Sequence, residues 1–264
     1  LISLNDIAKN VSLFRRARYE EVYKVSFLRA ISELTITQQF RRLANNGAKL
    51  TPFNFSFQSE NNFFLQFQVE PNSLPPSNIH VIIGRNGVGK THLINNMVNG
   101  LLSNNSINKF INTEKENRIF SNLICVSFSA FDDFNNINEI RDKSTQITYH
   151  YIGIKSAFEQ NNNLDIYNNI SEKLSLDFYI SFWNCIKGLK KHLWISILEI
   201  LESDPIFREM DISSLTQLDS NDKKFKSNVL SKFKKLSSGH KIVLLTLTKL
   251  IEKTEERSLI LLDE

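Results

Sequence analysis

The period of apolar and polar positions changes along the N-terminal part of the chain. Apolar residues recur at mostly helical spacing between Tyr19 and Leu34, which predicts that the segment 1–48 is helical. The spacing then shortens to two residues, which predicts half-buried strands at Phe53–Gln58 and Phe63–Val69. A short polar segment joins them, so we expect an antiparallel β piece closed by a hairpin.

Short continuous apolar runs follow, and such runs are typical of strands buried in a parallel sheet. They lie at Ile79–Ile83 and Leu123–Phe128. Residues 92–102 can form a helix after the first run, whereas the Asn-rich residues 103–117 are expected to be a solvated excursion. The alternation of strand, helix and strand predicts an α/β core.

Helical spacing dominates the chain after residue 135. One β-like piece, Gln146–Ile154, comes first. The helical stretches that follow cover residues 170–182, 183–201 and 225–236. We therefore interpret residues 135–235 as a mainly helical insertion into a core built from residues 49–134 and 236–264.

Candidate chemistry begins at the glycine-rich sequence VIIGRNGVGKT, Val81–Thr91, which fits the phosphate-loop pattern G-x-x-x-x-G-K-[ST]. Glycines allow the backbone N–H groups to turn inward around phosphate oxygens, and the following helix adds its dipole. The candidate nucleotide-binding residues are Gly84, Arg85, Asn86, Gly87, Val88, Gly89, Lys90, Thr91 and His92. Such a loop predicts nucleotide binding but does not distinguish a kinase, a GTPase, a motor and a switch.

A second cluster lies near the C-terminal end. Ser237, Ser238 and Gly239 precede the apolar stretch Ile242–Ile251, an arrangement that indicates either an anion site at a helix start or a plain N-cap. The run SLILLDE, Ser258–Glu264, follows. It predicts a buried parallel strand that ends in two carboxylates beside the phosphate loop.

In this order, GRNGVGKT, LSSGH and LILLDE resemble the Walker A, signature and Walker B motifs of ABC-type ATPases. The late signature and the helical insertion before it are similar to the branch that contains SMC, RecF and DNA-repair proteins. The layout is also similar to the ATPases of prokaryotic anti-phage systems, such as the Septu and retron-associated ATPases, which act with a nuclease partner. The resemblance implies the α/β fold of an ABC ATPase head, a P-loop NTPase.

The resemblance also implies ATP and Mg²⁺ as cofactors. Lys90 would reach the β- and γ-phosphates, and Thr91 with Asp263 would hold Mg²⁺. Glu264 would be the catalytic base that activates water.

Self-association follows from the same family, because its signature binds the γ-phosphate of ATP held by the opposite subunit. Ser237, Ser238 and Gly239 would then imply a head-to-tail dimer that closes on ATP and opens on hydrolysis. The partner that such a cycle would control is expected to be a nuclease or another effector.

Two departures from the family pattern bear on hydrolysis. Ser238 and His240 stand where the common LSGGQ signature has glycine and glutamine. No glutamine follows Leu123–Phe128 either. The polar residues there are Ser127, Ser129, Asp132 and Asp133, which could contact the nucleotide or cap a turn.

Several alternatives remain open at this point. An ATP-dependent assembly scaffold would hydrolyse slowly or not at all, and the substituted signature favours it. An SMC- or RecF-like DNA-repair ATPase would bind DNA. A small-molecule kinase would explain Asp263 but not the serines at a helix start, and a transporter subunit would need the absent glutamine.

Composition and charge indicate which kinds of partner the chain could bind. A formal net charge of +4 and a pI near 8.9 do not demand a nucleic-acid partner. The strongest basic patch is the lysine-rich region Lys223–Lys235, interleaved by Phe225 and Phe233, which is either a solvated helix face or a nucleic-acid contact. Trp183 and Trp194 lie among aliphatic residues, which favours packing in the core over a role in binding a ligand.

Cysteine use and apolar run length suggest the compartment. Cys125 and Cys185 show no metal-type spacing and favour a reduced, cytoplasmic compartment. No run approaches the length of a membrane helix, so no membrane partner is expected. The chain starts at Leu1 rather than at a methionine and stops at Glu264 directly after an apolar run, so we expect a fragment.

Overall fold

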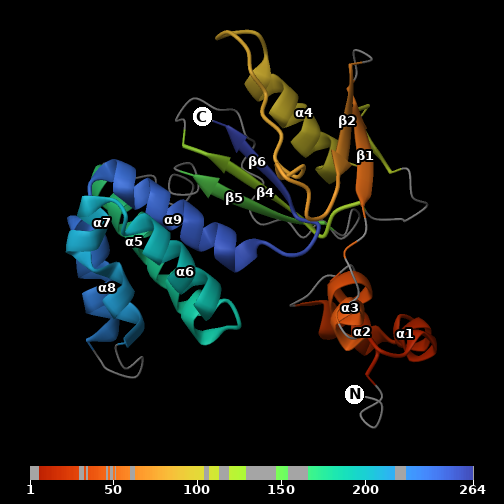
Figure 1. Cartoon of the computed structure of the whole chain (residues 1–264), viewed down its shortest axis with the longest axis horizontal. Helices are drawn as coiled ribbons and strands as arrows, with labels where there is room; N and C mark the ends of the chain where they lie inside the picture. The colour runs from red at the N-terminus through yellow and green to blue at the C-terminus, as the bar shows by residue number, and fades with distance from the viewer. Residues whose placement is uncertain are drawn as a thin grey trace. The chain divides into compact units, whose positions relative to one another are not determined.

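In the computed structural model, the chain forms two compact units; Figure 1 draws the whole chain. The first contains residues 1–125, 132–150 and 255–263, and the second contains residues 126–131 and 151–254. The structure describes residues 6–29, 33, 35–45, 47, 50, 52–59, 63–103, 107–112, 119–128, 147–153, 166–217 and 224–263.

The N-terminal segment is built from short helical pieces. These are α1 (Val11–Ala17), α2 (Glu21–Val25), the 3-10 helix η1 (Phe27–Arg29), the π-helix η2 (Thr35–Phe40) and α3 (Arg41–Ala44). The prediction of one helix from Tyr19 to Leu34 is wrong, because α2 ends at Val25. Val22 and Val25 are 73% and 68% exposed, whereas Tyr23 between them is buried. The segment therefore packs through an aromatic ring, and β-branched valines on the solvent side do little to extend a helix.

The first sheet is antiparallel and carries an aromatic core. Strands β1 (Phe53–Gln58), β2 (Phe64–Val69) and β3 (Lys109–Asn112) lie in the order β2-β1-β3. The first two form the hairpin that the alternation predicts, with Phe57 opposite Leu65. The third corrects the expectation of a solvated excursion, since Phe110 packs its ring 5.0 Å from that of Phe57. Phe110 thus packs residues 109–112 of this segment onto the sheet.

The second sheet is parallel and has the order β5-β4-β6, with β4 at Asn122–Ser127, β5 at Thr148–Gly153 and β6 at Leu259–Asp263. The Ser121 N–H donates to the Arg257 carbonyl, which places the starts of β4 and β6 side by side. At the other end of β4, the Tyr151 hydroxyl of β5 donates to the Ser127 carbonyl. Every residue of the central strand β4 is buried, as its continuous apolar run predicts.

Two apolar runs behave differently from their predicted strands. Ile79–Ile83 forms no strand, and Val81 and Ile83 are 77% and 91% exposed. That prediction is wrong because an apolar run becomes a strand only where another strand accepts its hydrogen bonds, and none among the described residues does so. The run at β6 does form its strand, but as an edge of the described sheet. Leu261 is buried there, while Leu262 is 60% exposed.

The helical unit contains α5 (Ile166–Lys187), α6 (Lys191–Leu201), α7 (Pro205–Met210), the 3-10 helix η4 (Ile212–Gln217), α8 (Phe225–Lys235) and α9 (Ser238–Lys253). The predicted helix 183–201 is wrong, because the chain turns at residues 188–190 between α5 and α6. Gly188 ends α5, and the Lys190 ammonium then donates to the carbonyls of Glu252 and Thr254, which holds the turn against the end of α9.

The core of the helical unit is aromatic. Buried rings include Phe178, Phe182, Trp194, Phe225 and Phe233. The Trp194 indole N–H donates to the Thr248 hydroxyl of α9 at 3.1 Å inside this core. The expectation that both tryptophans serve packing is confirmed, since Trp183 also packs against the cluster.

Candidate nucleotide-binding site

The phosphate loop is a tight turn in which each of its three glycines has a structural reason. Gly87 and Gly89 have φ angles of +79° and +101°, a region that side-chain-bearing residues rarely adopt. At Gly84 a Cβ would lie 2.7 Å from the Cγ1 atom of the exposed Val88, so that side chain would have to shift to admit a larger residue. The glycine pattern found in the sequence therefore corresponds to a backbone bent sharply around residues 84–89.

Helix α4 (Lys90–Leu102) begins directly after this turn and its first N–H groups lack a side-chain cap. Its N-cap is Gly89, which has no side chain to accept from them. The buried face of the helix consists of Ile94, Met97, Val98, Leu101 and Leu102, and the helix packs against β3 and β6. Packing thus fixes the helix while its positive end stays open, which favours an anion.

Lys90 folds back over the loop. Its ammonium donates to the carbonyls of Gly84 at 2.9 Å and of Arg85 at 3.1 Å. Both carbonyls belong to exposed residues, so phosphate oxygens can replace them as partners at little cost in desolvation. Thr91 is half-buried in the first helical turn, whereas Asn86, Val88 and His92 are exposed. The predicted phosphate-binding residues therefore lie together on one loop and one turn.

Asp263 is the last residue of β6, the strand that packs against α4. Its Oδ2 atom is buried and has no hydrogen-bond partner among the described residues. A buried carboxylate oxygen without a donor is costly unless a cation completes it. Asp263 and the Thr91 hydroxyl are the hard oxygen ligands that Mg²⁺ prefers, so these residues fit the ion that the motifs imply.

The described residues contain no group of three or more His, Cys, Asp or Glu side chains that could hold a metal by themselves. The proposed base, Glu264, lies outside the described residues, as do Ser129, Asp132 and Asp133.

The signature residues belong to the helical unit, at the start of α9. Ser237 is the N-cap, and its hydroxyl accepts the His240 N–H at 3.4 Å. Of the two interpretations that the sequence allowed here, the structure contains the N-cap. Ser238 and Gly239 are exposed, and a Cβ on Gly239 would meet no atom within 4 Å. Nothing among the described residues requires glycine there, so close approach by another molecule remains a reason for it.

His240 is held on both sides of its ring. Its Nδ1 atom lies 2.5 Å from the Ser237 hydroxyl, and its Nε2 atom lies 3.6 Å from an Asp204 carboxylate oxygen. The Phe207 ring meets the imidazole edge to face at a centroid distance of 5.0 Å.

Asp204 is the residue that sequence reasoning missed. As the N-cap of α7, its carboxylate accepts the N–H groups of Ile206 and Phe207. The hydrogen bond from the Ile206 N–H is the largest cause that lowers the pKa of Asp204 below its usual value. The bond from the Phe207 N–H and the nearby imidazole lower this pKa further. Asp before Pro205 is a recognisable helix start, but no sequence signal links it to His240.

The lysine-rich region is partly satisfied within the chain. Lys232 donates to the Ser214 hydroxyl at 2.7 Å, and Lys226 lies over the Tyr179 ring. Phe225 and Phe233 are 2% and 1% exposed, so the idea that they interleave the lysines at a binding surface is wrong. Their helical spacing places them in the core instead. Lys223 lies outside the described residues, and a nucleic-acid contact through the remaining lysines stays a prediction.

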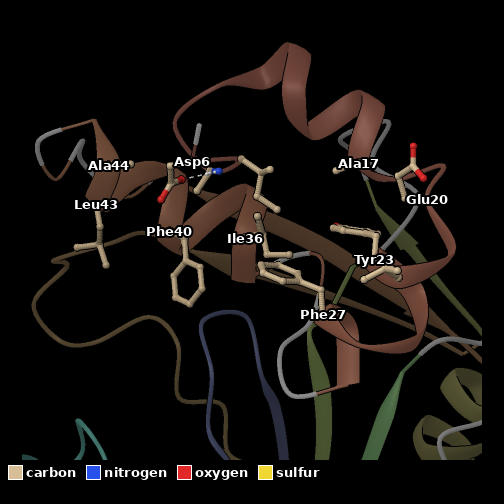
Figure 2. Close-up of a pocket in the computed structure, with 12 residues that line it drawn as sticks. Asp6, Ala17, Glu20, Tyr23, Phe27, Ile36, Phe40, Leu43 and Ala44 are labelled. Atoms are coloured by element: carbon tan, nitrogen blue, oxygen red, sulfur yellow. Dashed lines mark hydrogen bonds between the residues drawn. The ribbon is translucent and has the colours of Figure 1, made fainter. Parts of the chain in front are cut away.

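A pocket lies in the N-terminal segment (Figure 2). Tyr23, Phe27, Ile36 and Phe40 line it, and its volume is about 800 Å³. Among its lining residues, Asp6 uses its carboxylate to cap the Ala8 N–H at 2.8 Å. An apolar hollow of this kind provides no anchor for a nucleotide, so the phosphate loop remains the candidate site.

Both cysteines are buried, and they form no disulfide with each other. The pKa of the Cys185 thiol is raised to about 12, mainly because the thiol is buried and secondly because the Glu252 carboxylate lies nearby. In the part of the chain that the structure describes, every helix is too short or too polar to cross a bilayer.

Comparison with known proteins supports the phosphate loop. A family model described as RNA helicase, a P-loop NTPase family, matches residues 80–185, a stretch that contains the loop and α4. Protein ea59 of Escherichia phage lambda is 35% identical over 274 residues. The match covers 93% of this chain and 51% of that protein, so the chain spans about half the length of this curated relative. No solved structure matches the chain.

Proposed function

We propose that this chain carries an ABC-type ATPase site that binds ATP with Mg²⁺ and hydrolyses it. The observation that carries the proposal is the sharply bent loop 84–89, which leads into the uncapped N-terminus of α4 with the Lys90 ammonium folded over it. A match to a P-loop NTPase family over the same residues supports nucleoside triphosphate binding.

Each residue has a separate role in this proposal. The N–H groups of the loop and of the first turn of α4 bind phosphate oxygens, and Lys90 exchanges its carbonyl partners for the β- and γ-phosphates. Asp263 and Thr91 hold Mg²⁺, which supplies neutralising charge to the phosphates. Glu264 orients the attacking water and accepts its proton.

A second copy of the chain completes the site. Ser237, Ser238 and Gly239 contact the γ-phosphate held by the opposite copy, and the free space at Gly239 supports such an approach. ATP then closes a head-to-tail dimer, and hydrolysis opens it, because contact with the γ-phosphate differs between the two states.

The partner controlled by this cycle is proposed to be a nuclease or another effector in prokaryotic antiviral defence. This part rests on the order and spacing of the three motifs. The name of the phage relative states no activity and adds no support for it. A slowly hydrolysing scaffold is the alternative within the same class, and the substitutions Ser238 and His240 favour it.

A DNA-repair ATPase of the SMC or RecF type is the second candidate. The match to a family described as RNA helicase favours a nucleic-acid substrate, and exposed lysines such as Lys235 at the end of α8 offer charge for it. Salt-dependent binding of DNA or RNA by the full-length protein, weakened in a Lys235→Glu variant, tests this candidate.

ATP turnover and oligomeric mass, with and without ATP, test the main proposal. We expect slow turnover by the full-length wild type, and an inactive Glu264→Gln variant that stays dimeric in ATP. Lys90→Ala should lower ATP affinity by about tenfold or more, since it removes charge-assisted hydrogen bonds. Lys109→Ala, at an exposed lysine of β3, is the matched control. Equal inactivity of wild type and Glu264→Gln with ATP still bound would favour the scaffold.

A further inference from the structure

We propose that Thr35 and Arg42, in the N-terminal segment, are positioning residues for Asp263. They anchor the turn from which β6 starts, and the anchored turn sets where the Asp263 carboxylate lies at the end of that strand. The inference rests on the proposed function, because it concerns the magnesium side of the same ATP site.

The anchor consists of two contacts between residues that are far apart in the sequence. The Thr35 hydroxyl donates to Glu255 Oε2 at 2.6 Å, and the Arg42 guanidinium donates to Glu256 Oε2 at 2.8 Å. Thr35 is only 4% exposed, and the side chains of Arg42 and Glu256 are 26% and 21% exposed. Partial burial strengthens such an ion pair relative to a fully solvated one, because water and salt screen the charges less.

The N-terminal side of the anchor is held in place by packing. Thr35 opens the π-helix η2, and the next residue, Ile36, is fully buried in an apolar cluster with Phe14 and Tyr23. Arg42 lies in α3, which follows η2 directly and packs against it. The two side chains that reach the turn therefore come from one packed segment, which fixes their positions.

The turn itself is closed by its own hydrogen bonds. Ser258 Oγ accepts the Glu255 N–H at 2.7 Å and donates to the Glu255 carbonyl at 2.9 Å. Arg257 has a φ of +61°, which a side-chain-bearing residue keeps only where its surroundings enforce it. Its guanidinium lies over the Phe53 ring at 4.5 Å, and its carbonyl accepts the Ser121 N–H at the start of β4. The turn is thus a compact unit from which β6 continues.

The strand carries the position of the turn to the site. It has five residues, Leu259–Asp263, and is an edge of the described sheet. A slip of one residue would move its end by about 3.3 Å and turn Asp263 to the other face. Mg²⁺ requires ligands at about 2.0–2.1 Å in near-ideal geometry, so a smaller shift of the buried Oδ2 atom already weakens the site.

A purely structural anchor would behave differently. Its loss would lower the melting temperature but leave the metal affinity of the folded protein unchanged. Binding of the nucleotide without metal depends on the phosphate loop and Lys90, so a positioning role predicts that this affinity stays the same while metal affinity falls. Metal affinity and nucleotide affinity must therefore be measured separately.

The test is binding of Mn²⁺, as a probe for Mg²⁺, to the full-length protein loaded with a non-hydrolysable ATP analogue, with free Mn²⁺ counted by electron paramagnetic resonance. Arg42→Gln removes the ion pair, and Thr35→Val removes the hydroxyl at nearly constant volume. Each should weaken Mn²⁺ binding about tenfold, the worth of one charge-assisted hydrogen bond, with affinity for the analogue in EDTA unchanged. Thr35→Ser keeps the hydroxyl and should bind Mn²⁺ as wild type does.

Arg18→Gln is the matched control, because Arg18 pairs with Glu33 at 2.9 Å within the same segment. Its Mn²⁺ affinity should equal that of wild type. The inference is overturned if folded Arg42→Gln and Thr35→Val bind Mn²⁺ as wild type does, or if Arg18→Gln or Thr35→Ser loses as much affinity as they do. In those cases wild type still binds analogue and Mn²⁺, and the proposed function stands. Wild type that binds no analogue overturns both.

Discussion

Replacing Gly239 by alanine separates stability from function at the signature. The added methyl group meets no atom of the described residues within 4 Å, and the residue sits in the first turn of α9 with an ordinary helical backbone. Alanine lowers the entropy of the unfolded chain and suits a helix, which favours the folded state by about 0.5 kcal/mol at such a terminal position. For a chain of this size the melting temperature should rise by about 1–2 °C.

Association should change in the opposite direction. If a γ-phosphate from a second copy approaches this backbone, a methyl group prevents the closest contact, and ATP-dependent dimerisation should weaken by about tenfold, the loss of a good hydrogen bond. Differential scanning fluorimetry without nucleotide and sedimentation with ATP measure the two quantities on the same sample.

Two outcomes would refute this reasoning. A melting temperature that falls would mean that the space around Gly239 is already filled. Unchanged dimerisation would mean that no phosphate comes close. Gly89→Ala is the contrasting variant, because its φ of +101° makes alanine strained whatever the space. It should lower both the melting temperature and ATP affinity.

Three further predictions follow from single contacts. Asp263→Asn should leave ATP binding in place but raise the Mg²⁺ concentration needed for turnover by about tenfold or more, as measured by magnesium titration, because the amide removes the buried anionic oxygen. Trp194→Phe should destabilise the fold by about 1–3 kcal/mol in urea unfolding, since the Thr248 hydroxyl loses its buried donor; an unchanged midpoint would contradict this. Burial of the Glu252 carboxyl raises its pKa. Hydrogen bonds to the carboxylate, of which the one from Asn184 is the largest, outweigh this effect, so the pKa of Glu252 lies below its usual value. The ionised Glu252 side chain therefore stabilises the folded state fully above the unfolded-state pKa of about 4.3, and this contribution is lost as pH falls through the lower folded-state pKa. Glu252→Gln should therefore reduce the loss of stability that acid causes.

Sequence reasoning succeeded where the signal is local. Alternation at Phe53–Gln58 is a property of neighbouring residues, and the structure forms that strand and its hairpin. The apolar run before Asp263 likewise forms a strand, and the glycine spacing of the loop corresponds to required backbone angles.

The errors arose where distant residues decide. A run such as Ile79–Ile83 has strand composition, yet pairing depends on which other segments reach it. The helical spacing between Tyr19 and Leu34 does not tell which side chains are buried: Val22 is exposed, whereas Tyr23 packs against Phe14 and is buried. The contact between His240 and Asp204 joins residues in separate helices, so no local pattern predicts it.

The two buried thiols make the natural protein a ready host for site-specific probes. The chain has only two cysteines, and both side chains are shielded, Cys125 at 0% and Cys185 at 1% exposure. With the pKa of Cys185 raised to about 12, its reactive thiolate is scarce at neutral pH. A single cysteine introduced at an exposed position outside the proposed site, such as Ser196 on α6, would then react with a maleimide dye against a low background. Distances between two labelled copies could be followed through the ATP cycle without first removing the native cysteines.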